Sequence, residues 1–131
     1  MENRNNRNEI NQHPDYQQEL INIIRSNLPP KALRERLLDY HENDIAAVLE
    51  LLTKDERMKI YNILDSETLS DILEYADDYG VYFKELGIKK QAEVLSETEP
   101  DSAAEYLKQL DKTERKNLIE LMDDETKKAV V

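Results

Sequence analysis

The chain has 131 residues, with 29 Asp and Glu against 18 Lys and Arg and a formal net charge of −11. This length fits one domain or one lobe of a larger protein, and the charge argues against binding nucleic acid or an anionic membrane through overall electrostatics. With only two glycines and no cysteine, glycine-rich phosphate loops, disulfides, thiolate zinc sites and cysteine nucleophiles are excluded.

Residues 1–14 contain five Asn and two Arg and have no apolar face. We therefore predict a disordered tail over 1–14, and the same residues do not resemble a secretory signal. No apolar run approaches the roughly 18–20 residues that a membrane-spanning helix needs. We expect the chain as given to be soluble.

From residue 15 onward the apolar residues recur three and four positions apart, which is typical of short amphipathic helices. Pro29 and Pro30 separate the first helix from the second. No stretch alternates as a strand would. The expected buried faces, in chain order, are Leu20, Ile23, Ile24 and Leu28; Leu33 and Leu37; Ile45, Val48, Leu49 and Leu52; Ile60, Ile63 and Leu64; Leu69, Ile72, Leu73 and Ala76; Tyr79, Tyr82, Phe83 and Leu86; Ile88, Ala92 and Leu95; Ala103, Tyr106, Leu107 and Leu110; and Leu118, Leu121 and Met122.

Helix-start signals explain much of the acidic charge. Thr53 precedes Glu56 by three residues, and Asp111 precedes Glu114 by three, which is the spacing of a capping box. Further starts are predicted at Asp65 or Ser66, at Pro100-Asp101, and at Asp123 or Asp124. Acidic residues near these starts interact favourably with the helix dipole.

An internal repeat appears at an offset of 58 residues, without gaps. Paired short helices that repeat in sequence are typical of a helical solenoid. The nine identities pair Ala46, Leu49, Leu52, Lys54, Glu56, Arg57, Asp65, Glu67 and Thr68 with Ala104, Leu107, Leu110, Lys112, Glu114, Arg115, Asp123, Glu125 and Thr126.

Negative charge concentrates in two segments. Residues 42–78 carry eleven acidic and three basic side chains, and residues 93–125 carry eleven and four. Neighbouring helix starts in a solenoid could bring such carboxylates together, which would suit a hard divalent cation such as Mg²⁺. The simpler interpretation is that they are helix caps and solvated faces.

Catalysis is the least favoured function, and we expect the chain not to be an enzyme. His13 falls in the predicted tail and His41 at a helix junction, so the two histidines do not have metal-ligand spacing. A nucleophile elbow cannot be formed. Tyr79, Tyr82 and Phe83 have helical spacing, which favours core packing over a ligand pocket.

Residues 16–131 resemble the N-terminal cytosolic domain of the MgtE family of magnesium transporters and channels. Two departures are Glu42, where family members often have Pro, and the segment 77–83, which differs from the usual repeat start. The motifs that carry the resemblance are His41-x-x-Asp44-Ile45-Ala46, Leu49-x-x-Leu52, Glu56-Arg57, Asp71-Ile72-Leu73, Ala92-Glu93-Val94-Leu95 and Asp101-x-Ala103-Ala104-x-x-Leu107-x-x-Leu110.

The repeat and the resemblance together lead us to expect an all-α fold, a right-handed superhelix (solenoid) of about eight to ten short helices over residues 15–131. The resemblance implies a regulatory domain on the cytoplasmic side of the cell membrane, followed in the same polypeptide by CBS domains and a transmembrane pore. It further implies that Mg²⁺ binds between the acidic faces of this domain and the CBS pair and closes the pore. The full-length protein is expected to be a homodimer. The last residues begin like another helix and stop mid-pattern, as in a chain cut from a longer one.

The resemblance also implies two metal ligands, Asp71 in the Asp-Ile-Leu block and Asp101 at the start of the Asp-x-Ala-Ala helix. The remaining Mg²⁺ ligands would come from the CBS part, so the isolated domain should bind Mg²⁺ weakly. The structural alternative for Asp101 is a helix-start residue, and for Asp71 a solvated helix position.

The second hypothesis is a helical-repeat adaptor that binds a basic protein partner without sensing a metal. The flagellar motor switch family has a related architecture. Its Glu-His-x-Gln patch cannot be found in this sequence, which ranks the adaptor below the transporter domain.

Overall fold

The computed structural model describes residues 14–130, with side chains for residues 16–128, and over that range it contains ten α-helices, one 3₁₀ turn and no strand. This confirms the predicted all-α fold. Of the predicted tail, Pro14 begins the first described helix, and residues 1–13 lie outside the described range. The elements are α2 (Pro14–Arg25), α3 (Pro30–Leu37), α4 (Glu42–Val48), η1 (Leu49–Leu51), α5 (Lys54–Ile63), α6 (Ser66–Tyr75), α7 (Tyr79–Glu85), α8 (Ile88–Ser96), α9 (Pro100–Lys108), α10 (Lys112–Leu121) and α11 (Asp124–Val130).

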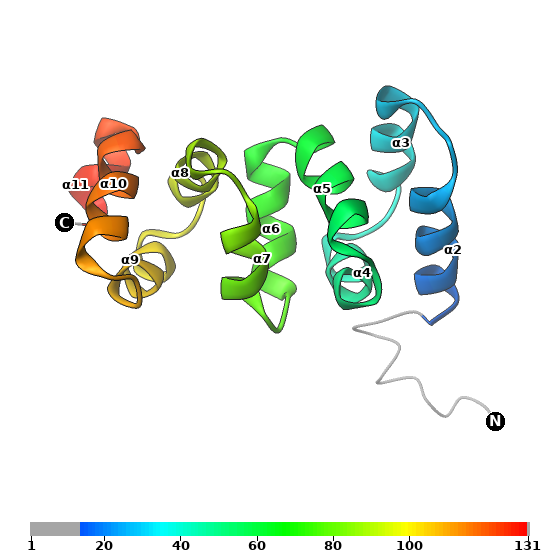
Figure 1. Cartoon of the computed structure of the whole chain (residues 1–131), viewed down its shortest axis with the longest axis horizontal. Helices are drawn as coiled ribbons and strands as arrows, with labels where there is room; N and C mark the ends of the chain where they lie inside the picture. The colour runs from blue at the N-terminus through cyan, green and yellow to red at the C-terminus, as the bar shows by residue number, and fades with distance from the viewer. Residues whose placement is uncertain (1–13, 131) are drawn as a thin grey trace.

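The helices follow one another along the long axis of an elongated molecule, from α2 and α3 at one end to α10 and α11 at the other (Figure 1). Most pack chiefly against the helix two places along, as in the pairs α2 with α4, α4 with α6, α6 with α8 and α8 with α10, whereas α7 packs against its direct neighbour α6. A chain of nearest-neighbour contacts is typical of solenoids. The right-handed twist stays a prediction.

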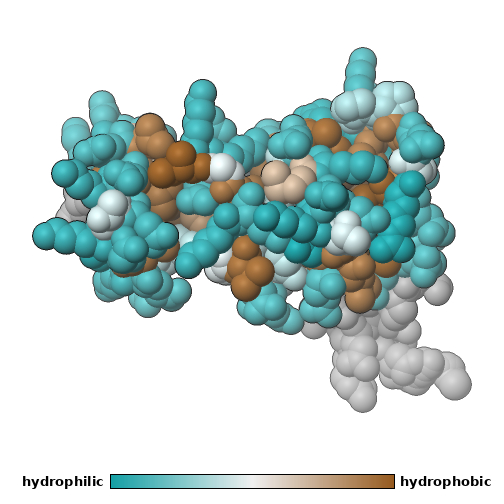
Figure 2. Space-filling model, viewed as in Figure 1, coloured by the Kyte–Doolittle hydropathy of each residue, from teal (hydrophilic) through white to brown (hydrophobic). Residues whose placement is uncertain are grey.

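The apolar core runs the length of this stack and consists largely of the positions that the helical spacing predicted. Figure 2 shows the face seen in this view as mostly hydrophilic, with apolar side chains in separate patches. Two predicted core positions are wrong, because Ile88 is 46% exposed and Leu121 is 51% exposed. They are the first residue of α8 and the last residue of α10. The side chains with 1% exposure or less include Leu20, Ile24, Leu37, Ile45, Ile60, Leu69, Leu73, Phe83 and Leu95.

Both predicted capping boxes are confirmed. The Glu56 amide donates to Thr53 Oγ1 at 3.2 Å, and the Thr53 amide donates to Glu56 Oε1 at 2.9 Å. At the second box the Glu114 amide donates to Asp111 Oδ1 at 2.8 Å, and the Asp111 amide donates to Glu114 Oε1 at a longer distance of 3.4 Å. These contacts satisfy backbone donors that have no partner inside the helix.

The sequence repeat is also a structural repeat. With the 58-residue offset, α3 to α6 of the first half recur as α8 to α11 of the second. The caps recur as well: the Thr68 amide donates to Asp65 and the Thr126 amide to Asp123, each at 2.7 Å. We therefore describe the molecule as a first unit, α2 to α6, and a second unit, α7 to α11.

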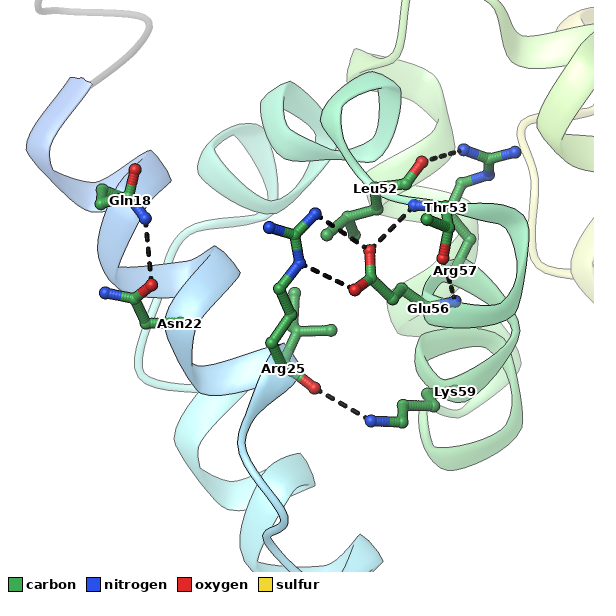
Figure 3. Close-up of polar contacts among 9 residues, drawn as sticks. Gln18, Asn22, Arg25, Leu52, Thr53, Glu56, Arg57 and Lys59 are labelled. Carbon is green, nitrogen blue, oxygen red and sulfur yellow. Dashed lines mark hydrogen bonds and ion pairs between the residues drawn. The ribbon is translucent and has the colours of Figure 1, made fainter.

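Inside the first unit, charged side chains bind helix ends together (Figure 3). Arg25 on α2 donates through Nε to Glu56 Oε2 at 2.7 Å, so the residue that closes the capping box also holds α2 against α5. Lys59 donates to the Ile24 carbonyl at 3.1 Å. These bonds fix the crossing of α2 and α5.

The two units meet through a half-buried polar network. Arg57 on α5 donates to both carboxylate oxygens of Glu85 on α7, at 2.9 and 2.6 Å, and the Tyr61 hydroxyl donates to the same carboxylate at 2.6 Å. Arg57 also donates to the carbonyls of Leu49 and Leu52, and its guanidinium lies over the Tyr82 ring at 5.4 Å. Both charged side chains are under 15% exposed.

Candidate functional site

The two residues predicted as metal ligands lie on α6 and α9. Asp71 is exposed on α6, on the side away from the buried Leu69, Ile72 and Leu73. Asp101 is exposed in the first turn of α9, directly after Pro100 at the first helical position. That location lets the positive end of the helix dipole stabilise the carboxylate.

A hollow of about 440 Å³ opens where α6, α7 and α9 meet. Three carboxylates line it, Glu74 from α6 and Asp101 and Glu105 from α9. Two tyrosines, Tyr79 and Tyr106, form its aromatic wall. The hollow therefore combines an acidic opening with an aromatic interior.

Asp71 is linked to this hollow through Glu74. Burial raises the pKa of Glu74, and the neighbouring charges of Asp71 and Glu99 raise it further. Like charges raise a carboxyl pKa because each disfavours ionisation of the next. We name the set Asp71, Glu74, Glu99, Asp101 and Glu105 the acidic rim.

The aromatic interior carries two buried phenol hydroxyl groups. Tyr79, Phe83 and Tyr106 form a cluster with ring centroids 4.5 to 5.6 Å apart. In the described part of the chain the Tyr106 hydroxyl makes no hydrogen bond, and Thr98 is the polar neighbour of the Tyr79 hydroxyl. Burial raises the pKa of both phenols to about 12, so they stay neutral near pH 7. The core packing predicted for Tyr79, Tyr82 and Phe83 is confirmed for Tyr82 and Phe83, which are buried, whereas Tyr79 is half-buried and lines the hollow.

The acidic rim has the donor chemistry that Mg²⁺ prefers, since all its ligand atoms are carboxylate oxygens. The rim does not form a complete site by itself, since among the described residues no three acidic or histidine side chains are placed to hold one metal ion. The residues therefore fit an outer contact with a hydrated cation, or a site to which other groups contribute.

Sequence reasoning missed Glu74, Glu99 and Glu105 as members of the rim. A signal was present, because Glu74 follows Asp71 by three residues and Glu105 follows Asp101 by four, which places each pair on one helix face. The sequence did not predict that α6 lies close to α9, because that contact depends on how the two units stack.

Three comparisons with known proteins bear on this site. Residues 40–131 match the family described as the MgtE intracellular N domain. The chain is similar to a solved structure described as the soluble part of a magnesium transporter, with a TM-score of 0.75 and 22% identity, covering 89% of this chain. It spans 47% of that structure, about half. Among the curated proteins, none matches the chain.

None of the helices between residues 14 and 130 combines the length and the apolar character needed to cross a membrane.

Proposed function

Because the chain belongs to the MgtE intracellular N domain family, we propose that it is the Mg²⁺-sensing, pore-gating domain on the cytosolic side of a magnesium transporter. The observation that carries the proposal is the acidic rim, where the charges of Asp71 and Glu99 already raise the pKa of Glu74. Carboxylates crowded in this way are stabilised by a nearby cation. Asp71 and Asp101 are proposed as direct ligands, with Glu74 as a third carboxylate between them.

The proposed mechanism is a population shift. Without a cation, the acidic rim repels a second acidic surface, which the family resemblance assigns to the CBS domains of the same polypeptide. A Mg²⁺ ion shared between the two surfaces lowers the free energy of the closed arrangement only, so its binding favours the closed pore. Falling Mg²⁺ restores the repulsion and opens it. The same resemblance assigns the full protein a homodimeric state and a location in the cell membrane.

The rim alone should bind weakly, in the millimolar range, because the second surface contributes the other ligands. Titrating MgCl₂ into the ¹⁵N-labelled chain at constant ionic strength should shift the amides near Asp71, Glu74 and Asp101 selectively. A uniform response that NaCl reproduces would contradict the proposal.

A peptide-binding experiment separates this function from the adaptor hypothesis. A lysine-rich peptide that binds the rim equally with and without Mg²⁺, at matched ionic strength, would favour an adaptor. Displacement of the peptide by Mg²⁺ below the concentration at which Na⁺ acts would support the sensor.

A further inference from the structure

The hollow between α6, α7 and α9 carries negative charge that nothing in its lining balances. Glu74, Asp101 and Glu105 line it, and among the described residues that line it there is no lysine or arginine. None of the ion pairs between described residues includes one of these three carboxylates. The two charges that raise the pKa of Glu74, those of Asp71 and Glu99, are also negative. The hollow is therefore electrostatically suited to a cation.

The inner wall of the hollow is aromatic, which sets the kind of cation that fits. The rings of Tyr79 and Tyr106 lie 5.4 Å apart, centroid to centroid, and both line the hollow. The face of a tyrosine ring attracts an ammonium group, and its apolar surface covers methylene groups. Mg²⁺, by contrast, takes oxygen ligands and gives up its water reluctantly. The interior therefore suits an organic ammonium ion better than a metal ion.

A buried hydroxyl group in this wall is a second feature that points to a ligand. Tyr106 is 8% exposed and lines the hollow, and its hydroxyl has no hydrogen-bond partner among the described residues. A buried polar group without a partner is unfavourable, and a ligand that donates to it removes that cost. Since an ammonium group carries donors only, the neutral Tyr106 hydroxyl can accept a hydrogen bond from it.

The size of the hollow and the distribution of its charges favour a ligand with more than one ammonium group. Its volume of about 440 Å³ lies in the range of small-molecule sites, roughly 300–1,000 Å³. Asp101 and Glu105 are one helical turn apart on α9, and Glu74 lines the hollow from α6. Charges spread over two helices match a chain with positive charge at both ends better than they match a single ammonium group.

We propose that the hollow is a binding site for a linear aliphatic polyamine, a chain of methylene groups with an ammonium group at each end. Its ammonium groups pair with Glu74, Asp101 and Glu105. Its methylene groups lie on the rings of Tyr79 and Tyr106, and the Tyr106 hydroxyl accepts a hydrogen bond from one ammonium group. This site goes beyond Mg²⁺ sensing and does not depend on it, although the two cations compete for Asp101.

Putrescine, a diamine, is the probe, and Mg²⁺ is its control because both carry two positive charges. Each is titrated at constant ionic strength into the full chain, labelled with ¹⁵N and with ¹³C in its tyrosine rings. Putrescine should shift the ring signals of Tyr79 and Tyr106 and the amide of Gly80, which lines the same hollow. Mg²⁺ should shift these ring signals less, by a factor of about three, since a hydrated ion stays at the acidic rim.

Glu105→Gln should weaken putrescine binding roughly fivefold, the upper effect of losing one exposed ion pair. Tyr79→Leu should weaken it by a similar factor, because the cation loses a ring face. The matched controls are Glu35→Gln on α3 and Tyr75→Leu on α6, an exposed glutamate and an exposed tyrosine that do not line the hollow. Both should retain the affinity within about twofold. Because Glu105 is exposed, its variant tests the site even if Tyr79→Leu lowers stability.

Equal ring shifts with putrescine and Mg²⁺, equal losses in the controls and in the hollow variants, or no shift at tens of millimolar putrescine would each overturn the proposal. Blocked lysine, Nα-acetyl-lysine amide, carries one ammonium group and should bind about threefold more weakly than putrescine. Equal binding would overturn the proposal in favour of a lysine side chain of a partner protein. The Mg²⁺ titration reports on the rim separately, so failure of the magnesium proposal is distinguishable from failure of this one.

Discussion

Two kinds of charged residue occur in this molecule, and their surroundings decide what each does. Arg57 and Glu85 are nearly buried and satisfy each other, with Tyr61 as a further donor. Glu74 stands among other carboxylates, and burial and neighbouring negative charge raise its pKa. The first arrangement stabilises the fold, whereas the second leaves an unfavourable charge that a cation can relieve.

Arg57→Met should lower the free energy of unfolding by about 2–3 kcal/mol, because it leaves the Glu85 carboxylate half-buried without its main partner. The repeat provides the control: Arg115→Met, at the equivalent position, should change stability by less than about 0.5 kcal/mol, as typical of surface substitutions. Urea unfolding measures both. Equal losses would show that the Arg57 contact has no special weight.

Glu74→Gln should stabilise the fold near pH 7. Since the folded-state pKa of Glu74 is raised, the protonated form is favoured in the fold, and that stability is lost as pH rises through the folded pKa. A neutral glutamine retains it. The gain should stay below about 1 kcal/mol, because Glu74 is exposed to solvent screening.

Thermal unfolding from pH 4 to 8 checks this prediction, and the gain should shrink toward the acidic end, where glutamate is itself protonated. Glu35→Gln on α3 makes the same charge change far from the rim. A destabilised Glu74→Gln variant at pH 7 would contradict the role given to Asp71 and Glu99 around it.

At the scale of helices, local sequence signals determine where each element begins. His41 accepts a hydrogen bond from the Asn43 amide through Nδ1 and so begins α4, which explains its place in the His-x-x-Asp motif. Capping boxes begin α5 and α10, and Asp65 begins α6. Caps and apolar spacing are local, so sequence was sufficient to predict them.

Asp65→Ala should lower the free energy of unfolding by about 1 kcal/mol, the usual effect of losing an N-cap. Its repeat counterpart, Asp123→Ala, removes the same 2.7 Å bond from α11 at the end of the stack. There the loss should appear as faster amide exchange within α11, with little change in global stability, because terminal elements open locally. A global loss as large as that of Asp65→Ala would contradict this picture of stacked neighbours.

At the scale of the whole molecule, the stacking of two units creates what sequence alone could not provide. The 58-residue repeat predicted that the halves are equivalent, and α3 to α6 do recur as α8 to α11. It did not predict that Glu85 pairs with Arg57, since nothing in the sequence distinguishes Glu85 from a solvated helix residue. Nor did it reveal that Glu99 lies near Glu74, because that contact joins α6 of the first unit to the start of α9 in the second unit.

Asp71 and Asp101 were chosen by family resemblance, and the fold places both on the acidic rim without bringing three ligands onto one ion. Their role as Mg²⁺ ligands stays a prediction. The rim's crowded charge is the physical reason to test it.

The most direct test is the Mg²⁺ affinity of two double variants, measured by NMR titration at constant ionic strength. Asp71→Asn with Asp101→Asn removes two rim carboxylates, and Glu35→Gln with Glu120→Gln removes the same charge from exposed positions on α3 and α10. We predict that the first variant loses the localised shifts, with affinity at least tenfold weaker, and that the second retains them. Equal weakening in both variants would contradict a specific magnesium site and leave only a diffuse response to negative charge.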